Sequence, residues 1–174
     1  MPSAAAPAPL IVTAILPHEV HRWASELRRR HFPPERNHLE AHVTLFHALP
    51  PSSEAEVRAA LASEAAACAP PAARIERLLD LGRGTALRVD CPPLLDLRAR
   101  LAERFHGLLT AQDSHRPRLH VTIQNKVSRG EALALQSALP PTLVRRAFAF
   151  TGLGLHIYAG GPWRAAGNYP FRSG

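Results

Sequence analysis

The chain has 174 residues, of which 46% are apolar and 20% are charged. These fractions are typical of a soluble globular protein and exclude a disordered or fibrous chain. The length suits one domain, which we expect to consist of two similar lobes. The formal net charge of +7 favours anionic partners such as RNA, nucleotides or phosphate esters, although a compositional bias towards Arg, Ala and Pro would give the same charge.

The N-terminus and the two cysteines bear on where the protein works. Residues 1–9 are rich in Ala and Pro, and we expect a flexible tail there, before a single domain over residues 10–174. The apolar run that follows the tail is too short for a membrane span and lacks a basic n-region. Cys68 and Cys91 lack metal-ligand spacing and make no disulfide framework, so we expect both to be buried and reduced in a cytoplasmic protein.

Prolines and turn residues divide the first half of the chain into strands and helices. Apolar runs predict strands, apolar residues at helical spacing predict helices, and Pro-Pro pairs end several of them. Ser52 or Ser53 is expected as the N-cap of the second helix. The predicted elements are a strand over 10–16, a helix from Pro17 to the Pro33-Pro34 pair, a strand over 42–49 and a helix over 54–68.

The second half repeats this order, so the sequence predicts a duplicated α+β unit. A hairpin turn at Gly82-Arg83-Gly84 precedes the repeat, and Ser128 is the expected N-cap of its second helix. The predicted elements are strands over 74–81 and 85–91, a helix over 94–108, a strand over 120–124, a helix over 129–139, and a final hairpin of 146–158 with 163–171. A duplication of this kind places equivalent strands across a pseudo-two-fold axis, facing one cleft.

Two short stretches with the same pattern lie 78 residues apart, one in each half. The first motif is His42-Val43-Thr44-Leu45, and the second motif is His120-Val121-Thr122-Ile123. Because successive residues of a strand face opposite sides, the His and Thr of each motif share one face and the two apolar residues share the other. The two polar side chains then lie roughly 6–7 Å apart along the strand, about the width of a small anion.

Two imidazoles on either side of one phosphate suit phosphodiester cleavage. Histidine titrates near neutral pH, so one ring can accept a proton from the nucleophile while the other donates one to the leaving oxygen. Two threonine hydroxyls can donate hydrogen bonds to the non-bridging oxygens, and the reaction requires no metal. A cyclic phosphate suits such a site because the ring holds the leaving oxygen in place.

With these motifs, the chain resembles the two-histidine (2H) phosphoesterase superfamily, which includes bacterial 2′-5′ RNA ligase-like proteins. The family signature is a doubled His-x-Thr/Ser-x in a bilobal, duplicated α+β fold, with two antiparallel sheets that face a central cleft and helices outside. The flanks of the first motif and the ending Gly160-Gly161-Pro162-Trp163 also resemble the bacterial branch. The order of elements fits this family over essentially the whole chain.

The resemblance implies that His42 and His120 are the acid–base pair and that Thr44 and Thr122 bind the phosphate. It leaves open which histidine is the acid. The implied reaction is hydrolysis of a 2′,3′-cyclic phosphate, on RNA 3′ ends or nucleotides, to a 2′-phosphate, and action on 2′-5′ linkages is a further implied activity. No cofactor is implied. Because one duplicated chain supplies both motifs, we expect a monomer.

Weaker candidates for substrate binding surround the motifs. Phe46 and Gln124 continue the His-x-Thr faces by alternation, so Phe46 is a candidate for stacking a base and Gln124 for touching the phosphate or ribose. Lys126 is a further candidate for the phosphate or ribose, although each of these has an ordinary structural alternative. The other candidates are Arg36 and Arg118 for steering an anion, and Tyr158 and Trp163 for stacking a base.

Three alternatives remain open at this stage. The spacings of His38, His42 and His47 suggest zinc, but no Cys or carboxylate cluster completes a ligand set, so we expect no metal. An RNA-binding module with the same fold would bind without turnover, although it would have no need of both histidines. A small non-RNA cyclic phosphate, such as an ADP-ribose derivative, is an alternative substrate, since the loops around the cleft set the choice of ligand.

Overall fold

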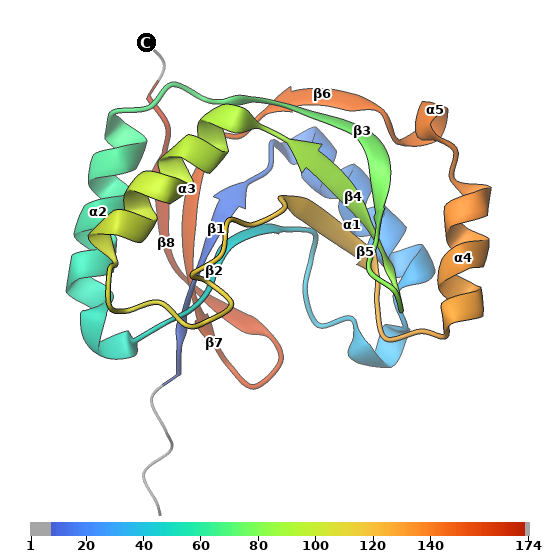
Figure 1. Cartoon of the computed structure of the whole chain (residues 1–174), viewed down its shortest axis with the longest axis horizontal. Coiled ribbons are helices and arrows are strands. Elements are labelled where there is room, and N and C mark those ends of the chain that lie inside the picture. The colour runs from blue at the N-terminus through green and yellow to red at the C-terminus, as the bar shows by residue number, and fades with distance from the viewer. Residues whose placement is uncertain (1–7, 173–174) are drawn as a thin grey trace, which may run out of the picture.

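The computed structural model describes residues 8–172, which fold into two four-stranded antiparallel sheets with helices outside (Figure 1). One sheet has the strand order β2-β1-β7-β8 and the other has the order β5-β4-β3-β6. The predicted α+β class with two antiparallel sheets is therefore confirmed. Residues 1–7 of the predicted tail lie outside the described part of the chain. Pro9, also assigned to the tail, accepts a hydrogen bond from the backbone N–H of Tyr158 (3.2 Å).

The strands follow the predicted order closely. The first sheet consists of β1 (Leu10–Ile15), β2 (Val43–Leu49), β7 (Gly152–Tyr158) and β8 (Trp163–Pro170). The second sheet consists of β3 (Ala72–Asp80), β4 (Thr85–Asp90), β5 (His120–Gln124) and β6 (Arg146–Ala149). The two motif strands, β2 and β5, each lie at an edge of their own sheet and pack near one another.

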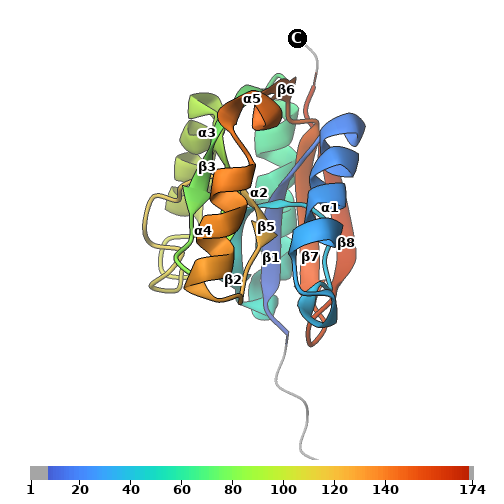
Figure 2. The ribbon, with the colours of Figure 1, turned by 90° about the vertical axis from the view of Figure 1, so that its right-hand side faces the viewer.

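The helices connect the strands and cover both sheets. They are α1 (His18–His31), α2 (Glu54–Ala66), α3 (Pro92–Arg104), α4 (Arg129–Ala138) and α5 (Pro141–Val144), with short 3-10 helices at Pro34–Arg36 and Pro51–Ser53. α2 packs against β7, β8 and α3, while α4 packs against β3 and β4. α1 connects two strands of the first sheet but packs against β5 of the second, and Figure 2 shows β5 between α4 and α1.

Each half of the chain contributes a strand to the sheet of the other half. The first half supplies β1 and β2 to one sheet, but its next strand, β3, pairs with β4. The second half supplies β4 and β5, and its later strands β7 and β8 return to the first sheet, where β7 pairs with β1. Neither sheet is complete within one half of the chain, although the two motif strands occupy equivalent edges.

The helix starts and ends agree partly with the predictions. Ser128 caps α4 through a capping box, in which its hydroxyl accepts from Glu131 N–H (3.1 Å) and the Glu131 carboxylate accepts from Ser128 N–H (3.4 Å). Ser53 occupies the N-cap of α2 without a side-chain hydrogen bond, because a 3-10 turn precedes the helix. α3 ends four residues earlier than predicted, shortly before Gly107, which adopts a positive φ of 83°.

The predicted strand 146–158 is wrong, because the chain changes sheets within it. β6 pairs with β3, and β7 pairs with β1 and β8. At the crossing, Phe150 is fully buried and the N–H of Thr151 donates to the carbonyl of Ile15 (3.0 Å). The hairpin of β7 with β8 is confirmed. The sequence analysis also missed α5, because the Pro140-Pro141 pair was interpreted only as the end of the preceding helix. Pro141 is in fact the first residue of this short helix, a position where proline is favoured.

The two cysteines are free thiols. Cys91 is buried and its thiol donates to the carbonyl of Ala72 (3.3 Å), as expected for a small core residue. Cys68 is only half-buried, so the expectation of full burial is wrong for this residue, which lies just beyond the end of α2. Over residues 8–172, the structure has no helix whose length and apolar character would let it cross a membrane.

Candidate functional site

The two motif histidines are held in the same way. Nδ1 of His42 lies 2.8 Å from the carbonyl oxygen of Glu40, and Nδ1 of His120 lies 2.6 Å from the carbonyl oxygen of Arg118. A carbonyl oxygen only accepts, so in each ring Nδ1 carries the hydrogen and donates it. The acceptor of the neutral ring is then Nε2, which is the atom that can exchange a proton with a substrate.

The predicted alternation of polar and apolar faces in the two motifs is correct as far as the threonines. Thr44 and Thr122 are half-buried, as are the two histidines, whereas Val43 and Val121 are fully buried in the core. Thr44 lies opposite Thr13 of β1, and Thr122 lies opposite Ala86 of β4. The alternation of the strands therefore gives each motif one face in the core and one polar face.

Both motif strands carry a β-bulge directly after the threonine. On β2, Thr44 and Phe46 oppose consecutive residues of β1, so Leu45 is the extra residue. On β5, Thr122 and Gln124 oppose consecutive residues of β4, so Ile123 is the extra residue. A bulge interrupts the alternation of faces, so the residue after it turns to the opposite side from the one that simple alternation predicts.

The bulge on β2 explains why the prediction for Phe46 is wrong. Phe46 is fully buried, and its ring packs edge-on against Phe105 at a centroid distance of 5.5 Å. The guanidinium of Arg98 lies 4.3 Å from the centre of the same ring. With both sides of the ring covered, Phe46 is a core residue and offers no surface for a nucleobase.

Gln124 is also held in the interior, which corrects its expected contact with substrate. Its side-chain oxygen accepts from the Thr85 hydroxyl (3.0 Å), and its side-chain nitrogen donates to the carbonyl of Glu131 (3.4 Å). Only 6% of its surface is exposed. Gln124 thus connects β5 to β4 and to the start of α4, and the bulge at Ile123 again accounts for its direction.

One pocket brings together members of both motifs and most of the weaker candidates. Its volume is about 330 Å³, and His42 from the first motif and Thr122 from the second both line it. Thr44 and His120 are not among its lining residues, although the charge of His120 is close enough to lower the pKa of His42. The other lining residues are Arg28, Phe32, Arg36, His38, Leu39, Asn125, Lys126, Tyr158, Gly161 and Trp163.

The pocket has a cationic wall and an aromatic wall. Arg36 and Lys126, two of the predicted anion contacts, line it together with Tyr158 and Trp163, the two predicted stacking residues. Arg118 does not line the pocket, and its backbone carbonyl instead orients His120. Tyr158 is 43% exposed, so its ring is available to a ligand.

Lys126 adopts a backbone conformation that is costly for a residue with a side chain. Its φ is +60°, and among residues 8–172 it is the one non-glycine residue with a positive φ. Its backbone N–H donates to the side-chain oxygen of Asn125 (2.9 Å), which fixes this turn after β5. Strained backbone of this kind costs about 1–3 kcal/mol and clusters at functional sites.

Replacing Lys126 by glycine is expected to separate stability from affinity. Glycine adopts a positive φ without strain, so we expect the free energy of unfolding to stay the same or rise by up to about 1 kcal/mol. The loss of the cation is expected to weaken anion binding several-fold. Denaturant unfolding and titration with a nucleoside monophosphate measure the two effects. Lys126→Arg, which keeps the charge, is the matched control, and equal affinity in all three proteins would contradict a role in binding.

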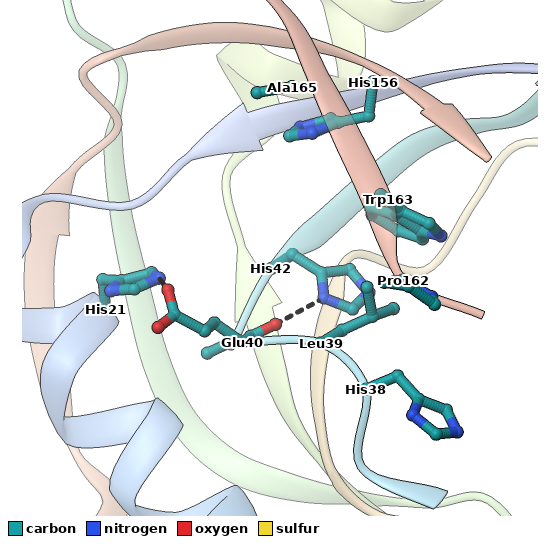
Figure 3. A pocket seen from close by; sticks show the side chains of 10 residues that line it. His21, His38, Leu39, Glu40, His42, His156, Pro162, Trp163 and Ala165 are labelled. Carbon is teal, nitrogen blue, oxygen red and sulfur yellow. Dashed lines mark hydrogen bonds and ion pairs between the residues drawn. The ribbon is translucent and has the colours of Figure 1, made fainter. Parts of the chain in front are cut away.

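A second pocket of about 340 Å³ is also lined by His42 (Figure 3). His21 from α1 forms an ion pair with Glu40 there (3.2 Å), and Trp163 from β8 packs against His42 at a centroid distance of 4.6 Å. His156 from β7 also lines this pocket, and its ring centre lies 5.5 Å from that of Trp163. His42 therefore lines this second pocket as well as the first.

The surroundings of His42 favour its neutral form. Its pKa is lowered to about 4, chiefly by burial and also by the positive charges of Arg28, His156 and His120, while the hydrogen bond to the Glu40 carbonyl opposes the shift. At neutral pH the ring is therefore unprotonated at Nε2. A neutral imidazole beside cationic side chains is in the form that can accept a proton.

The sequence analysis missed Arg28 and Asp113. Arg28 was not among the candidates, yet it is 3% exposed and lines the pocket beside His42. Asp113 is 1% exposed, and its carboxylate accepts from the backbone N–H groups of His47 (2.9 Å) and Ala48 (3.0 Å). A helical pattern with arginine at an apolar position was the available signal for Arg28, whereas the loop around Asp113 gave none.

The structure does not assemble the histidines into a ligand set for a metal. Among the described residues, no group of three or more His, Cys, Asp or Glu side chains is placed to hold an ion. His47, within β2, instead pairs with Asp113 through Nδ1 (3.0 Å), whereas His42 lies directly before β2.

The comparisons with known proteins identify the family. Residues 16–162 match the family model described as the 2′-5′ RNA ligase superfamily. The chain belongs to this superfamily of two-histidine phosphoesterases, and the resemblance expected from the two motifs is confirmed. Comparison of the sequence with curated proteins gives no match.

Solved structures of the same fold cover nearly the whole chain. TT0787 of Thermus thermophilus is similar with a TM-score of 0.68 at 17% identity, over 95% of this chain and 98% of that one. E. coli LigT in complex with 3′-AMP is similar with a TM-score of 0.65 at 18% identity, over 97% of this chain and 100% of that one. A crystal structure described as a phosphoesterase is similar with a TM-score of 0.64 at 16% identity, over the same shares of the two chains.

Proposed function

We propose that the protein is a metal-independent phosphodiesterase that opens 2′,3′-cyclic phosphates to 2′-phosphates. The observation that carries the proposal is the equivalent setting of the two motif histidines. Each donates Nδ1–H to the carbonyl two residues earlier, on neighbouring edge strands, and so keeps Nε2 for a substrate. Two imidazoles that bind through Nδ1 in the same way and keep Nε2 for the substrate are the parts that paired proton transfer across one phosphate requires.

In the proposed reaction, His42 is the general base and His120 is the general acid. The low pKa of His42, about 4, leaves its Nε2 free to take a proton from water at neutral pH. That water attacks phosphorus, the bond from phosphorus to O3′ breaks, and Nε2–H of His120 donates its proton to O3′. The product is a 2′-phosphomonoester with a free 3′-hydroxyl, and a proton passes from His42 to His120 through solvent before the next turnover.

The threonines and the cationic wall support charge on the phosphate. The hydroxyls of Thr44 and Thr122 lie on the histidine faces of their strands, where they can donate to non-bridging oxygens as negative charge grows. Lys126 and Arg36 supply positive charge along the same pocket. These parts stabilise the transition state electrostatically, which is the reason that no metal ion is needed in this proposal.

The proposed substrates are RNA 3′ ends and nucleotides that carry the cyclic phosphate. Tyr158 and Trp163 provide aromatic surface for a base next to the cationic wall. E. coli LigT, which is similar in fold, has been solved with 3′-AMP, NADP+ and ATP, and this supports a nucleotide as the ligand. A single chain contributes both motifs, so the proposed enzyme acts as a monomer.

Turnover of a panel of cyclic phosphates tests the proposal. The protein is incubated with nucleoside 2′,3′-cyclic phosphates, an RNA oligonucleotide ending in one, and a cyclic phosphate of ADP-ribose, each with excess EDTA. Phosphorus NMR is expected to show a 2′-phosphate as the single product from the nucleotides and RNA. Binding without product would favour the RNA-binding module, and turnover of the ADP-ribose compound alone would favour the small-molecule alternative.

A further inference from the structure

We infer that Arg28 and Arg98 are a reciprocal pair of positioning residues, each of which extends from one half of the chain to hold the motif strand of the other half. Both are almost fully buried, with exposed fractions of 3% and 5%. The consequence for catalysis rests on the proposed function, whereas the effect of Arg28 on His42 does not.

Arg28 extends from α1 to the second motif. Its Nη1 donates to the carbonyl oxygen of Thr122 at 2.8 Å. Its Nε donates to the carbonyl oxygen of Leu39 (3.1 Å), and Nε and Nη2 both donate to the side-chain oxygen of Asn37 (3.2 and 3.0 Å). One guanidinium thus fixes the backbone at one phosphate-binding threonine and the loop that leads into the other motif.

Arg98 makes the equivalent connection in the opposite direction. It extends from α3, in the second half of the chain, and its Nε donates to the carbonyl oxygen of Leu45 (3.2 Å) in the first motif. Its Nη2 donates to the carbonyl oxygen of Asp113, in the loop that precedes the second motif. Each arginine also lies over an aromatic ring, Arg28 at 4.4 Å from Phe32 and Arg98 at 4.3 Å from Phe46.

These contacts meet a specific need of the motif strands. β2 and β5 are edge strands, so alternate backbone groups along their outer sides have no neighbouring strand to pair with. Both strands also bulge directly after the threonine, which disrupts the ladder on the paired side. The acceptors that the arginines bind, Thr122 and Leu45, lie within these bulged segments. A planar, multiply donating guanidinium is suited to fixing such backbone.

The charged guanidinium of Arg28 also acts on His42. Its acceptors are neutral oxygens, and a buried cation paired with neutral groups is costly for the fold. Burial lowers the pKa of Arg28 to about 10, so it remains charged at neutral pH. It lines the same pocket as His42 and lowers the pKa of that ring, after the larger effect of burial. Arg98 has no such effect, so the two arginines are distinguishable.

Several other groups contribute to the electrostatic environment of His42. They are His21 from α1, Arg36, His38 and Glu40 from the loop before β2, His120 from β5, Lys126 after β5, and His156 and Tyr158 from β7. The test therefore keeps all of these unchanged and alters only the arginines.

The experiment compares Arg28→Met, Arg28→Lys and Arg98→Met with two control variants. Arg29→Met and Arg100→Met remove exposed arginines that are close neighbours on the same helices and pair with Glu26 and Glu64. Histidine NMR titration gives the pKa of His42 in each protein, steady-state kinetics on a 2′,3′-cyclic nucleotide gives kcat and KM, and thermal unfolding reports the folded fraction at the assay temperature. Arg28→Lys keeps the charge, so it tests the idea even if Arg28→Met folds poorly.

We expect Arg28→Met to raise the pKa of His42 by about one unit, since a neighbouring positive charge is removed. The acidic limb of its kcat/KM profile then moves to higher pH by the same amount. In Arg28→Lys, the pKa of His42 is expected to stay low because the positive charge remains, but the planar guanidinium with its several N–H donors is lost. All three variants are expected to lower kcat by about 10- to 100-fold, as for misplaced catalytic groups, with a smaller change in KM. Arg98→Met is expected to leave the pKa of His42 unchanged.

Two results would overturn the inference. The first is an unchanged pKa of His42 in Arg28→Met, which would remove the electrostatic role. The second is a kcat that falls only in proportion to the unfolded fraction, so that the folded protein keeps full activity. The arginines would then have a structural role only. If the wild-type protein turns over no cyclic phosphate, the proposed function fails, and the NMR titration still decides whether Arg28 acts on His42.

Discussion

Replacing His42 or His120 by alanine is expected to lower kcat for a 2′,3′-cyclic nucleotide by about 10²–10⁴-fold, the usual contribution of a positioned acid or base. The physical reason differs for the two residues. Without His42, water must attack without a base, and without His120 the O3′ oxygen must leave without a proton. Both side chains are only half-buried, so we expect the fold to survive each change.

Kinetics of the single and double variants test this expectation. If the two rings act as one unit, His42→Ala combined with His120→Ala loses little more than either single variant, since effects of cooperating groups are not additive. His18→Ala, at the exposed first position of α1, is the matched control and is expected to keep full activity. Wild-type activity in either motif variant would exclude the proposed reaction at this site.

Replacing Phe46 by alanine is expected to lower the free energy of unfolding by about 3–5 kcal/mol, the usual cost of a phenylalanine deleted from a core. The ring is fully buried between Phe105 and the guanidinium of Arg98, so its removal leaves a cavity that these neighbours cannot easily fill. Because Phe46 does not face the pocket, the KM for a cyclic nucleotide is expected to stay near the wild-type value.

Denaturant unfolding and steady-state kinetics together distinguish this role from base stacking. Phe46→Leu, which keeps much of the apolar volume, is the control and is expected to cost about 1 kcal/mol, in the range for large apolar exchanges. A protein of unchanged stability with a strongly raised KM would return Phe46 to the list of substrate contacts.

The comparison of Phe46 with Thr44 shows how far a strand pattern can be followed. Up to the threonines, alternation and residue type place every side chain of the motifs on the correct face. Beyond them, the bulges turn Phe46 and Gln124 inward. A bulge depends on register with the neighbouring strand, which is a property of the sheet and not of the local sequence.

Arg28 illustrates a second limit of the sequence. An arginine in the last turn of a helix, such as Arg28 in α1, is usually a surface cation that interacts with the helix dipole. No local feature of the sequence shows which strand the helix will cover. The acceptor that makes it part of the site, Thr122, lies 94 residues away. By contrast, Arg36, Lys126, Tyr158 and Trp163 were found from their positions next to the motifs or the last turn, and they line one pocket.

The exchange of strands between the halves has a consequence for how the protein folds and how such a protein can arise. β1 pairs with β7, which is more than a hundred residues later in the chain. The first sheet therefore cannot form completely during synthesis until the last strands have been made. The lobes should therefore form in one cooperative transition. Two identical half-length chains with this topology would complete each other's sheets only as a two-fold symmetric, strand-swapped dimer. In the present chain, the same exchange of strands occurs within one molecule.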